Sequence, residues 1–515
     1  MDRVEHTGRR NVWFTALLVL TLFAGGCATH LPQQEKRSTY YYQHTGDAAL
    51  ARIVNPLLDG QPSLTRVLPL IDGLEAYAAR LAAIDQAQYS IDLQTYIFRK
   101  DKTGRYLVWS LLRAAERGVR VRILLDDFST RGIDRHLAML SHHPNIHIRL
   151  FNPFENRIFR GLEMLGSFSR LNRRMHNKSM TVDNLLSIVG GRNVGDEYFK
   201  ADNGLSFSDV DLMTIGPVVS DVSKQFDKYW NSEITVEIQN PDIDLESSSR
   251  ARLRLEALAL KMQRSRYGIQ MKDYSLSAYF EDPDSVWYRG DARLLFDEPD
   301  KVLSDPDDLS RYMIKDVRSA FDRVKHSVLF ISPYFIPGPE GTERIVELVS
   351  RGVEVVVVTN SLAATDVVAV HSGYSRYRSP LLSAGVKIHE VRVNPGSKPA
   401  QWFASSRASL HAKTFVLDHR WVFVGSSNFD PRSIRLNTEM GLLIDSPSLA
   451  RAINTRVTQQ LQEKTYRLSL TAGDKARILW HDDVSGESWS SEPDASIFRK
   501  IGAAFWRLLP VEDQL

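Results

Sequence analysis

The chain has 515 residues, of which 25% are charged and 43% hydrophobic, a composition typical of globular proteins and sufficient for two or more domains. Its formal net charge of +3 is too small to require or exclude an anionic partner. The single cysteine, Cys27, excludes an intramolecular disulfide and a zinc site built from several cysteines.

The first 26 residues have the pattern of a secretory signal peptide. Arginines precede an apolar run from Val12 to Ala24, and small residues lead from there to Cys27. This pattern resembles a bacterial lipoprotein signal, which implies cleavage before Cys27 and lipidation of its thiol. An uncleaved membrane anchor is the alternative. The apolar run and the small residues after it together span about 17 residues, which is close to the shortest segment that crosses a bilayer. Both interpretations place the chain in the bacterial cell envelope, facing the periplasm, with the inner or outer membrane left open. Residues 27–48 are polar and predicted to form a tether.

Two later segments repeat one order of features. In each, a helix-like stretch runs into Arg-Gly and then into a strand rich in Val, Ile and Leu, at residues 119–125 and 353–359. Continuous apolar strands that follow helices are typical of buried strands in βα units. The sequence therefore predicts an α/β fold of two fused halves related by a pseudo-two-fold axis. The predicted divisions are a first half at 49–235, a linker or insertion at 236–300, a second half at 301–465 and an amphipathic tail at 466–515.

Each predicted half carries one copy of the pattern H-x-K-x-x-x-x-D. The copies comprise His176, Lys178 and Asp183 in the first half, and His411, Lys413 and Asp418 in the second. An apolar strand and a turn follow each copy, and an asparagine, Asn193 or Asn428, stands 17 residues after each histidine. Two copies that agree in residue types and spacing are very unlikely by chance, so we expect them to act together.

The repeated residue types suit phosphoryl chemistry. On a strand, residues i and i+2 share a face, so His176 and Lys178 are expected to project together, as are their counterparts. Neutral imidazole is a nucleophile and imidazolium a general acid, while lysines supply positive charge to phosphate oxygens. Asn193 and Asn428 are expected to donate amide hydrogens to the same oxygens. The motif aspartates face the other way and are interpreted as structural, with a catalytic role as the alternative.

The duplicated motif resembles the hallmark of the phospholipase D superfamily, and the resemblance covers roughly residues 70–465. Within that superfamily the sequence is most similar to bacterial cardiolipin synthases of the C type. The stretches that carry this similarity are Leu171–Ser179, Gly190–Asn193, Thr359–Ala364 and Asn428–Ser433. The resemblance implies αβα sandwich halves that share a single active site.

The resemblance also implies a two-step mechanism without metal or cofactor. One histidine forms a phosphatidyl-histidine, and the other protonates the leaving alcohol and later deprotonates the incoming one. Family precedent favours His176 as the nucleophile and His411 as the acid and base. An acidic partner is expected for each histidine, and Asp209 in the first half and Glu439 in the second fit that position. A solvated strand end is the alternative for both carboxylates.

Three further residues are candidates for the substrate pocket. Tyr96 and Tyr334 end matching strands of the two halves, and His371, near Tyr374, follows a stretch that resembles the cardiolipin synthases. A purely structural role is the alternative for His371 and Tyr374. Two segments, 157–174 and 497–509, interleave basic and large apolar residues, which suits an interface with anionic lipid. The alternative is a core helix with snorkelling arginines for 157–174 and packing on the protein body for 497–509.

The leading functional prediction is transfer of a phosphatidyl group to phosphatidylglycerol or a related lipid alcohol, which gives cardiolipin. Phosphatidylethanolamine is a candidate second lipid. Hydrolysis by a phospholipase D, a nuclease activity and a non-catalytic envelope lipoprotein are the alternatives. A nuclease is expected to have a dense basic run, which the sequence lacks, so nucleic acid is not an expected partner. The sequence leaves a protein partner and the oligomeric state open.

Overall fold

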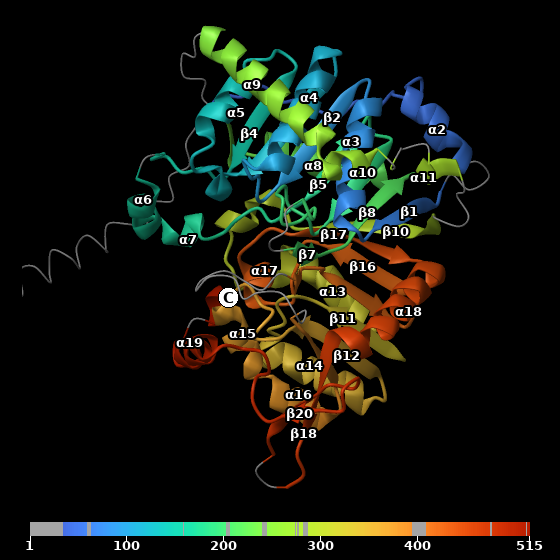
Figure 1. The fold of residues 1–515 in the computed structure, drawn as a ribbon, viewed down its shortest axis with the longest axis vertical. Helices are drawn as coiled ribbons and strands as arrows, with labels where there is room; N and C mark the ends of the chain where they lie inside the picture. Colours follow the sequence, from blue (N-terminus) through green and yellow to red (C-terminus); the bar gives the residue numbers. More distant parts are fainter. Residues whose placement is uncertain are drawn as a thin grey trace, which may run out of the picture.

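The computed structural model of the chain describes residues 34–58, 63–157, 159–201, 206–238, 245–272, 274, 278–281, 287–393, 408–473, 476–510 and 512–515. The predicted signal peptide and Cys27 lie outside these residues. Two α/β halves stack on one another, with the N-terminal half above the C-terminal half in Figure 1. The predicted fold of two fused α/β halves is confirmed.

The first half contains a mixed sheet whose central strands run parallel. Each of these central strands follows a helix, as the sequence pattern predicts. In spatial order the strands are β9 (Thr235–Glu237), β4 (Ile146–Phe151), β3 (Arg120–Asp126), β2 (Ser90–Thr95), β5 (Ser179–Val182), β6 (Leu186–Gly190), β8 (Asp211–Ile215) and β1 (Thr65–Leu70).

The second half repeats this order. Its strands are β18 (Thr465–Leu470), β13 (Lys387–Val391), β12 (Glu354–Asn360), β11 (Ser327–Ile331), β15 (Thr414–Leu417), β16 (Trp421–Gly425), β17 (Met440–Asp445) and β10 (Tyr288–Phe296). Strands β19 (Ile478–His481) and β20 (Ser488–Trp489) extend the sheet beyond β18. Strands β1 and β10 pair antiparallel at the centre and join the strands of the two halves named so far into one 18-stranded sheet.

Helices cover the sheets and complete the sandwiches. The first core is formed under α2 (Ala49–Leu58), α3 (Gly73–Gln86), α4 (Lys102–Glu116) and α5 (Asp134–Leu140). The second core is formed under α13 (Met313–Asp322), α14 (Gly338–Ser350), α15 (Val368–Ser375) and α16 (Arg378–Ala384). A third core joins strands of both halves with α8 (Val218–Asn231) and α18 (Pro447–Lys464). The strands are therefore covered on both faces, which explains their continuous apolar sequences.

Residues 236–300, expected from the sequence to be a linker or insertion, belong to both halves. Helices α9 (Leu245–Arg264), α10 (Arg266–Met271) and α11 (Ala278–Glu281) pack on the first half, where the Tyr267 hydroxyl donates to the carbonyl of Phe199 at 2.6 Å. Strand β10 at the end of the segment belongs to the second sheet. The chain thus passes between the halves through a strand pair rather than through a free linker.

The expected tether and tail are also in contact with the body. Residues 34–48 are the described part of the tether, and there Arg122 donates to the carbonyl of Thr39 at 2.9 Å. The predicted tail begins within β18, which pairs with β13. It ends in α19 (Ile497–Arg507), which packs against α15, and in a turn at Glu512–Gln514.

The two motif aspartates hold the starts of equivalent strands. The Asp183 carboxylate accepts from the backbone N–H groups of Gln88, Tyr89 and Ser90 at 2.9, 2.7 and 2.8 Å. Asp418 accepts in the same way from the three residues that lead into β11. These contacts agree with the structural interpretation of both aspartates.

We expect Asp183→Ala to lower the free energy of unfolding by about 2 kcal/mol, because three backbone donors lose a charged acceptor. The midpoint of urea denaturation measures this. Asp221→Ala is the matched control, since Asp221 is half exposed on α8 and pairs only with Lys224 in the helix. Equal midpoints for the two variants would contradict the structural role of Asp183.

Candidate active site

Both halves hold the segment that carries His176. Arg174 donates from Nε to Asp126 at 2.8 Å, and the backbone N–H of Met175 donates to the same carboxylate at 2.8 Å. The backbone N–H of His176 then donates to the carbonyl of Thr438, in the other half, at 2.8 Å. Strand β5 begins at Ser179, so His176 and Lys178 precede the strand on which the sequence analysis placed them.

The second motif is held in the same way. The short strand β14 (Ala408–Leu410) leads into His411 and pairs in parallel with β7 (Ser206–Ser208) of the first half. The backbone N–H of His411 donates to the carbonyl of Ser208 at 2.8 Å. Each motif histidine thus follows a segment that pairs with the other half.

The histidines and the predicted carboxylates pair crosswise. Nδ1 of His176 lies 2.9 Å from Oε2 of Glu439, and Nδ1 of His411 lies 2.6 Å from Oδ2 of Asp209. The sequence suggested one carboxylate in each half, and the structure gives each histidine the carboxylate of the opposite half. Glu439 and Asp209 are buried, so neither is a solvated strand end. Each half therefore supplies one histidine to one pair and one carboxylate to the other.

Further contacts fix the two carboxylates. The Ser426 hydroxyl donates to Oε2 of Glu439 at 2.5 Å, and the backbone N–H of Glu439 donates to Asp297 at 2.9 Å. At the equivalent place beside Asp209 stands Gly191. A Cβ there would lie 2.4 Å from Oδ1 of Asp209, so only glycine leaves room for this carboxylate.

Burial sets the protonation of the pairs. It lowers the pKa of His176 to about 4, although the Glu439 carboxylate acts in the opposite direction. It also lowers the pKa of His411, and the Lys413 ammonium adds to that effect. Burial opposes ionisation of Glu439, but its contacts with His176, Lys178 and Ser426 together outweigh burial, so the pKa of Glu439 lies below its ordinary value. A neutral His176 beside an ionised Glu439 donates from Nδ1 and leaves Nε2 with a free lone pair.

The two lysines lie beside their histidines. Lys178 donates from Nζ to the carbonyl of His176 at 2.5 Å, and Lys413 donates to that of His411 while lying 3.0 Å from its Nδ1. Burial lowers the pKa of Lys178 to about 7; Glu439 opposes this shift and Lys413 adds to it. Each motif therefore lies within the electrostatic field of the other.

An aromatic ring faces each histidine. The Tyr96 ring meets His176 edge to face with centroids 5.2 Å apart, and the Tyr198 ring meets His411 likewise at 5.3 Å. The sequence analysis named Tyr96 but missed Tyr198, whose only signal was its place in the turn after Asn193. Tyr334, the other tyrosine predicted for the substrate pocket, donates from its hydroxyl to Asp366 at 2.8 Å.

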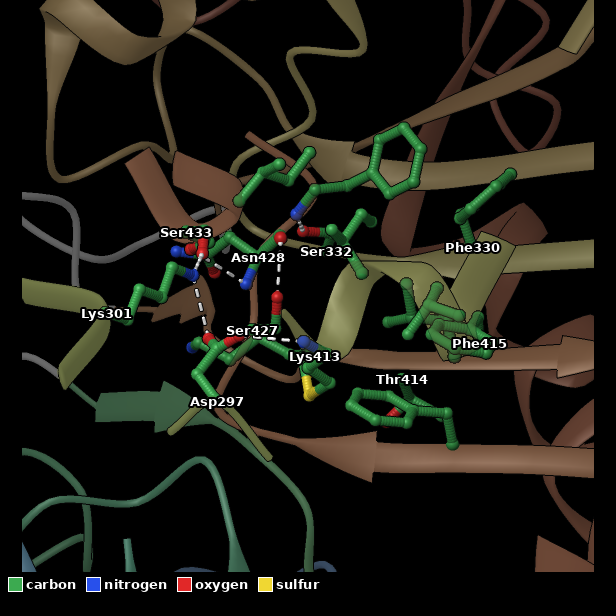
Figure 2. Close-up of a pocket in the computed structure, with 17 residues that line it drawn as sticks. Asp297, Lys301, Phe330, Ser332, Lys413, Thr414, Phe415, Ser427, Asn428 and Ser433 are labelled. Carbon is green, nitrogen blue, oxygen red and sulfur yellow. Dashed lines mark hydrogen bonds and ion pairs between the residues drawn. The ribbon is translucent and has the colours of Figure 1, made fainter. Parts of the chain in front are cut away.

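The two asparagines differ in their contacts. The Asn193 amide accepts from the N–H of Ile97 at 3.1 Å and donates to the Tyr198 hydroxyl at 2.9 Å. Asn428 lines a cavity of about 40 Å³ together with Lys413 and Thr414, as Figure 2 shows. Its Oδ1 and the hydroxyl of Thr414 are buried and have no hydrogen-bond partner among the residues that the structure describes. The free group of Asn428 is thus an acceptor, whereas both the oxygen and the nitrogen of the Asn193 amide have a partner.

His371 lies in a buried network, 2.8 Å from Nη2 of Arg378 and 3.4 Å from Oε1 of Glu492. Arg378 and the Tyr374 hydroxyl also reach Glu390, at 2.7 and 2.9 Å. His371 thus links α15 to the C-terminal segment and Tyr374 links α15 to β13, which agrees with the structural alternative for both residues.

Neither a metal cluster nor a membrane span is found in the described part of the chain. Among those residues, no three His, Cys, Asp or Glu side chains are grouped so as to hold a metal ion. None of the helices that the structure describes combines the length and hydropathy needed to cross a bilayer.

Comparisons with known proteins identify close relatives. The family described as cardiolipin synthase, PLD-like domain, matches residues 81–230 and 317–463. Cardiolipin synthase C of Escherichia coli (strain K12) is 39% identical over 484 residues, which cover 90% of this chain and 99% of that protein. An uncharacterized protein of Helicobacter pylori (strain ATCC 700392 / 26695) is 32% identical over 88% of this chain and 90% of its own. The crystal structure of phosphatidylserine synthase from Haemophilus influenzae Rd KW20 shares the fold, with a TM-score of 0.59 at 13% identity over 90% of this chain and 100% of that one.

The site is expected to bind a tetrahedral dianion most tightly at low pH. Lys178 is protonated below its pKa of about 7 and loses its charge above it, so affinity for sulfate falls as the pH rises. The loss approaches about tenfold per pH unit at most. Calorimetric titration with sulfate between pH 6 and pH 9 measures this, because sulfate itself does not change charge over that range. Lys178→Arg keeps its charge and should show a weaker pH dependence. An identical pH dependence in this variant would contradict the role of Lys178.

Proposed function

The chain belongs to the family of cardiolipin synthases with phospholipase D-like domains, and we propose that it is a phosphatidyltransferase that makes cardiolipin from phosphatidylglycerol and a second phospholipid. The observation that carries the proposal is the crosswise pairing of His176 with Glu439 and of His411 with Asp209. This arrangement supplies a neutral imidazole as nucleophile, a second imidazole that can carry a proton, and two lysines beside them. These are the groups that a two-step phosphoryl transfer requires.

In the first step, Nε2 of His176 attacks the phosphorus of the donor lipid. The new P–N bond forms, the P–O bond to the leaving alcohol breaks, and His411 gives its proton to the departing oxygen. Lys178, Lys413 and the Asn428 amide hold the non-bridging phosphate oxygens. The negative charge of the bound phosphate raises the pKa of His411, so that its imidazole is protonated when the donor is bound.

In the second step, His411 takes the proton of an incoming hydroxyl, whose oxygen attacks the phosphorus. The P–N bond breaks and His176 is restored. If the hydroxyl belongs to the glycerol headgroup of phosphatidylglycerol, the product is cardiolipin; if it belongs to water, the product is phosphatidic acid. Water is about 55 M, whereas an oriented hydroxyl reaches effective molarities of about 10⁵ M, so a bound lipid alcohol prevails. Phosphatidylethanolamine and phosphatidylglycerol are the proposed donors.

We further propose that the protein is a lipoprotein of the bacterial envelope that faces the periplasm. The support is the signal pattern that ends at Cys27. A lipid on Cys27 would keep the chain at the bilayer that holds both substrates, which is consistent with the proposed activity.

A donor with a good leaving group separates the two histidines. The p-nitrophenyl ester of phosphatidic acid needs no general acid for its first step, because p-nitrophenolate leaves without protonation. We expect His411→Asn to release a stoichiometric burst of p-nitrophenolate and then to stall, with turnover reduced about 10³-fold or more. His176→Asn should give no burst, since it lacks the nucleophile. Rapid-mixing absorbance measures both, and His136→Asn, on the exposed surface of α5, is the matched control. A burst confined to the His176 variant would exchange the two roles.

The lipoprotein proposal is tested at Cys27. We expect Cys27→Ser to take up no fatty acid and to remain uncleaved, because the thiol is the only group at that position able to carry the lipid. Metabolic labelling with a radioactive fatty acid measures the modification. Label in the serine variant equal to that of the unsubstituted chain would contradict lipidation at this residue.

A further inference from the structure

Helix α19 packs on the protein with its small residues and turns its large apolar residues outward. Gly502 and Ala503 face α15, where the Ser372 hydroxyl donates to the carbonyl of Ala503 at 3.0 Å. On the other side Ile501 and Phe505 are 60% and 57% exposed. A helix that served only to cover the body would bury its large side chains, so this orientation indicates a second partner.

Helices α6 (Arg160–Gly166) and α7 (Phe168–Leu171) also expose apolar residues, while their arginines are engaged within the protein. Leu162 and Phe168 are 69% and 50% exposed. Arg160 instead pairs with Asp127 and Asp134, and other arginines of the segment pair likewise. The sequence analysis suggested that basic and apolar residues of 157–174 together suit an interface with lipid, and the internal ion pairs leave the exposed apolar residues as the part of this segment that can face a bilayer.

Both exposed faces are attached to loops of the candidate active site. Helix α7 ends five residues before His176, and Asn172 in this link donates to the Gln514 side chain at 2.6 Å. Arg499 of α19 donates to the carbonyl of Leu362 at 2.8 Å and to that of Thr365, next to Asp366. Figure 1 shows α6, α7 and α19 along one side of the molecule, with the C-terminus between α7 and α19. The exposed faces are thus continuous with the elements that lead to both halves of the site.

We propose that these helices form one bilayer-docking surface, which seats the active site on an anionic membrane. The docking surface consists of Leu162, Phe168, Ile497, Ile501, Phe505 and Leu508. The proposal rests on the proposed function in that the docked bilayer would hold both lipid substrates.

Charge favours a bilayer over another protein as the occupant. Helix α19 contains three basic residues and no acidic one; Arg499 is engaged with loop carbonyls, which leaves Lys500 and Arg507 as the cations beside the exposed face. An apolar face bordered by cations suits the boundary between acyl chains and anionic headgroups. A second copy of the chain would bring the same cations against one another, at an electrostatic cost.

A polarity-sensitive fluorophore on an introduced cysteine tests the docking directly. The full-length Phe505→Cys protein, labelled at residue 505, is expected to shift to shorter wavelength with vesicles of phosphatidylglycerol and phosphatidylcholine. Leu253→Cys, equally exposed on α9, is the matched control and should not shift. The unsubstituted chain labelled in parallel corrects for Cys27. Equal behaviour of the two labels would overturn the proposal, and a shift without vesicles that grows with protein concentration would assign the face to a second copy and overturn it too.

Turnover separates docking from chemistry. The double variant Ile501→Ser, Phe505→Ser should lose about tenfold or more of its rate on phosphatidylglycerol vesicles and keep its rate on a short-chain phosphatidylglycerol below its micelle concentration. The matched control is Leu253→Ser, Ile269→Ser, whose positions are exposed on α9 and α10. Parallel loss on both substrates, or no loss on vesicles, would overturn the docking surface. If the unsubstituted chain turned over neither substrate while the label at residue 505 still shifted, the proposed function would fail and the docking surface would stand.

Discussion

The hydrogen bond between each motif histidine and a carboxylate of the opposite half is the contact on which the site depends. A buried imidazole needs a fixed partner to hold one tautomer, and here neither half contains both members of a pair. The halves must therefore dock before either histidine is oriented. Docking is secured by the apolar core between the two sheets and by the strand pair of β7 with β14. The docking of the halves and the orientation of the histidines are therefore coupled, because the segments that pair across this interface also carry the site residues.

Sequence periodicity predicted the parts of this arrangement but not how they are joined. The duplicated spacing identified both motif histidines, and the resemblance to the phospholipase D superfamily pointed to Asp209 and Glu439 as their acidic partners. A repeat does not reveal which copy of the carboxylate meets which histidine, because that depends on how two folded halves dock. Tyr198 was missed for the same reason: its contact with His411 joins residues more than two hundred positions apart. A strand that follows a helix can, by contrast, be predicted from its apolar run, and the strands expected at 119–125 and 353–359 are present as β3 and β12.

Charged residues gave incorrect expectations where their partners lie within the protein. The arginines before the first motif suggested a lipid-facing cationic segment, yet Arg157 and Arg160 pair with Asp127, about thirty residues earlier at the end of β3. His371 similarly joined a network with Glu492, which lies 121 residues away. The local sequence gives the number of charges in a segment. Their ion-pair partners lie on other parts of the fold, such as the carboxylate that follows β3, and only the folded structure shows them. The exposed apolar residues of this segment and of α19 form the proposed docking surface. The sequence indicated these two segments but not which of their side chains are exposed.

The pseudo-two-fold axis relates the histidines and their main partners but not every contact, and the differences favour a division of roles. Both oxygens of Glu439 lie within 3.1 Å of Nδ1 of His176, and the pKa of His176 near 4 keeps Nε2 unprotonated, as a nucleophile requires. His411 has Lys413 only 3.0 Å from its Nδ1, and this cation makes the imidazolium a stronger acid. A phosphate bound between the lysines offsets their charge and raises the pKa of His411. In the proposed mechanism, His411 therefore holds the proton that the leaving alcohol needs only while the donor lipid is bound, which couples its protonation to substrate binding.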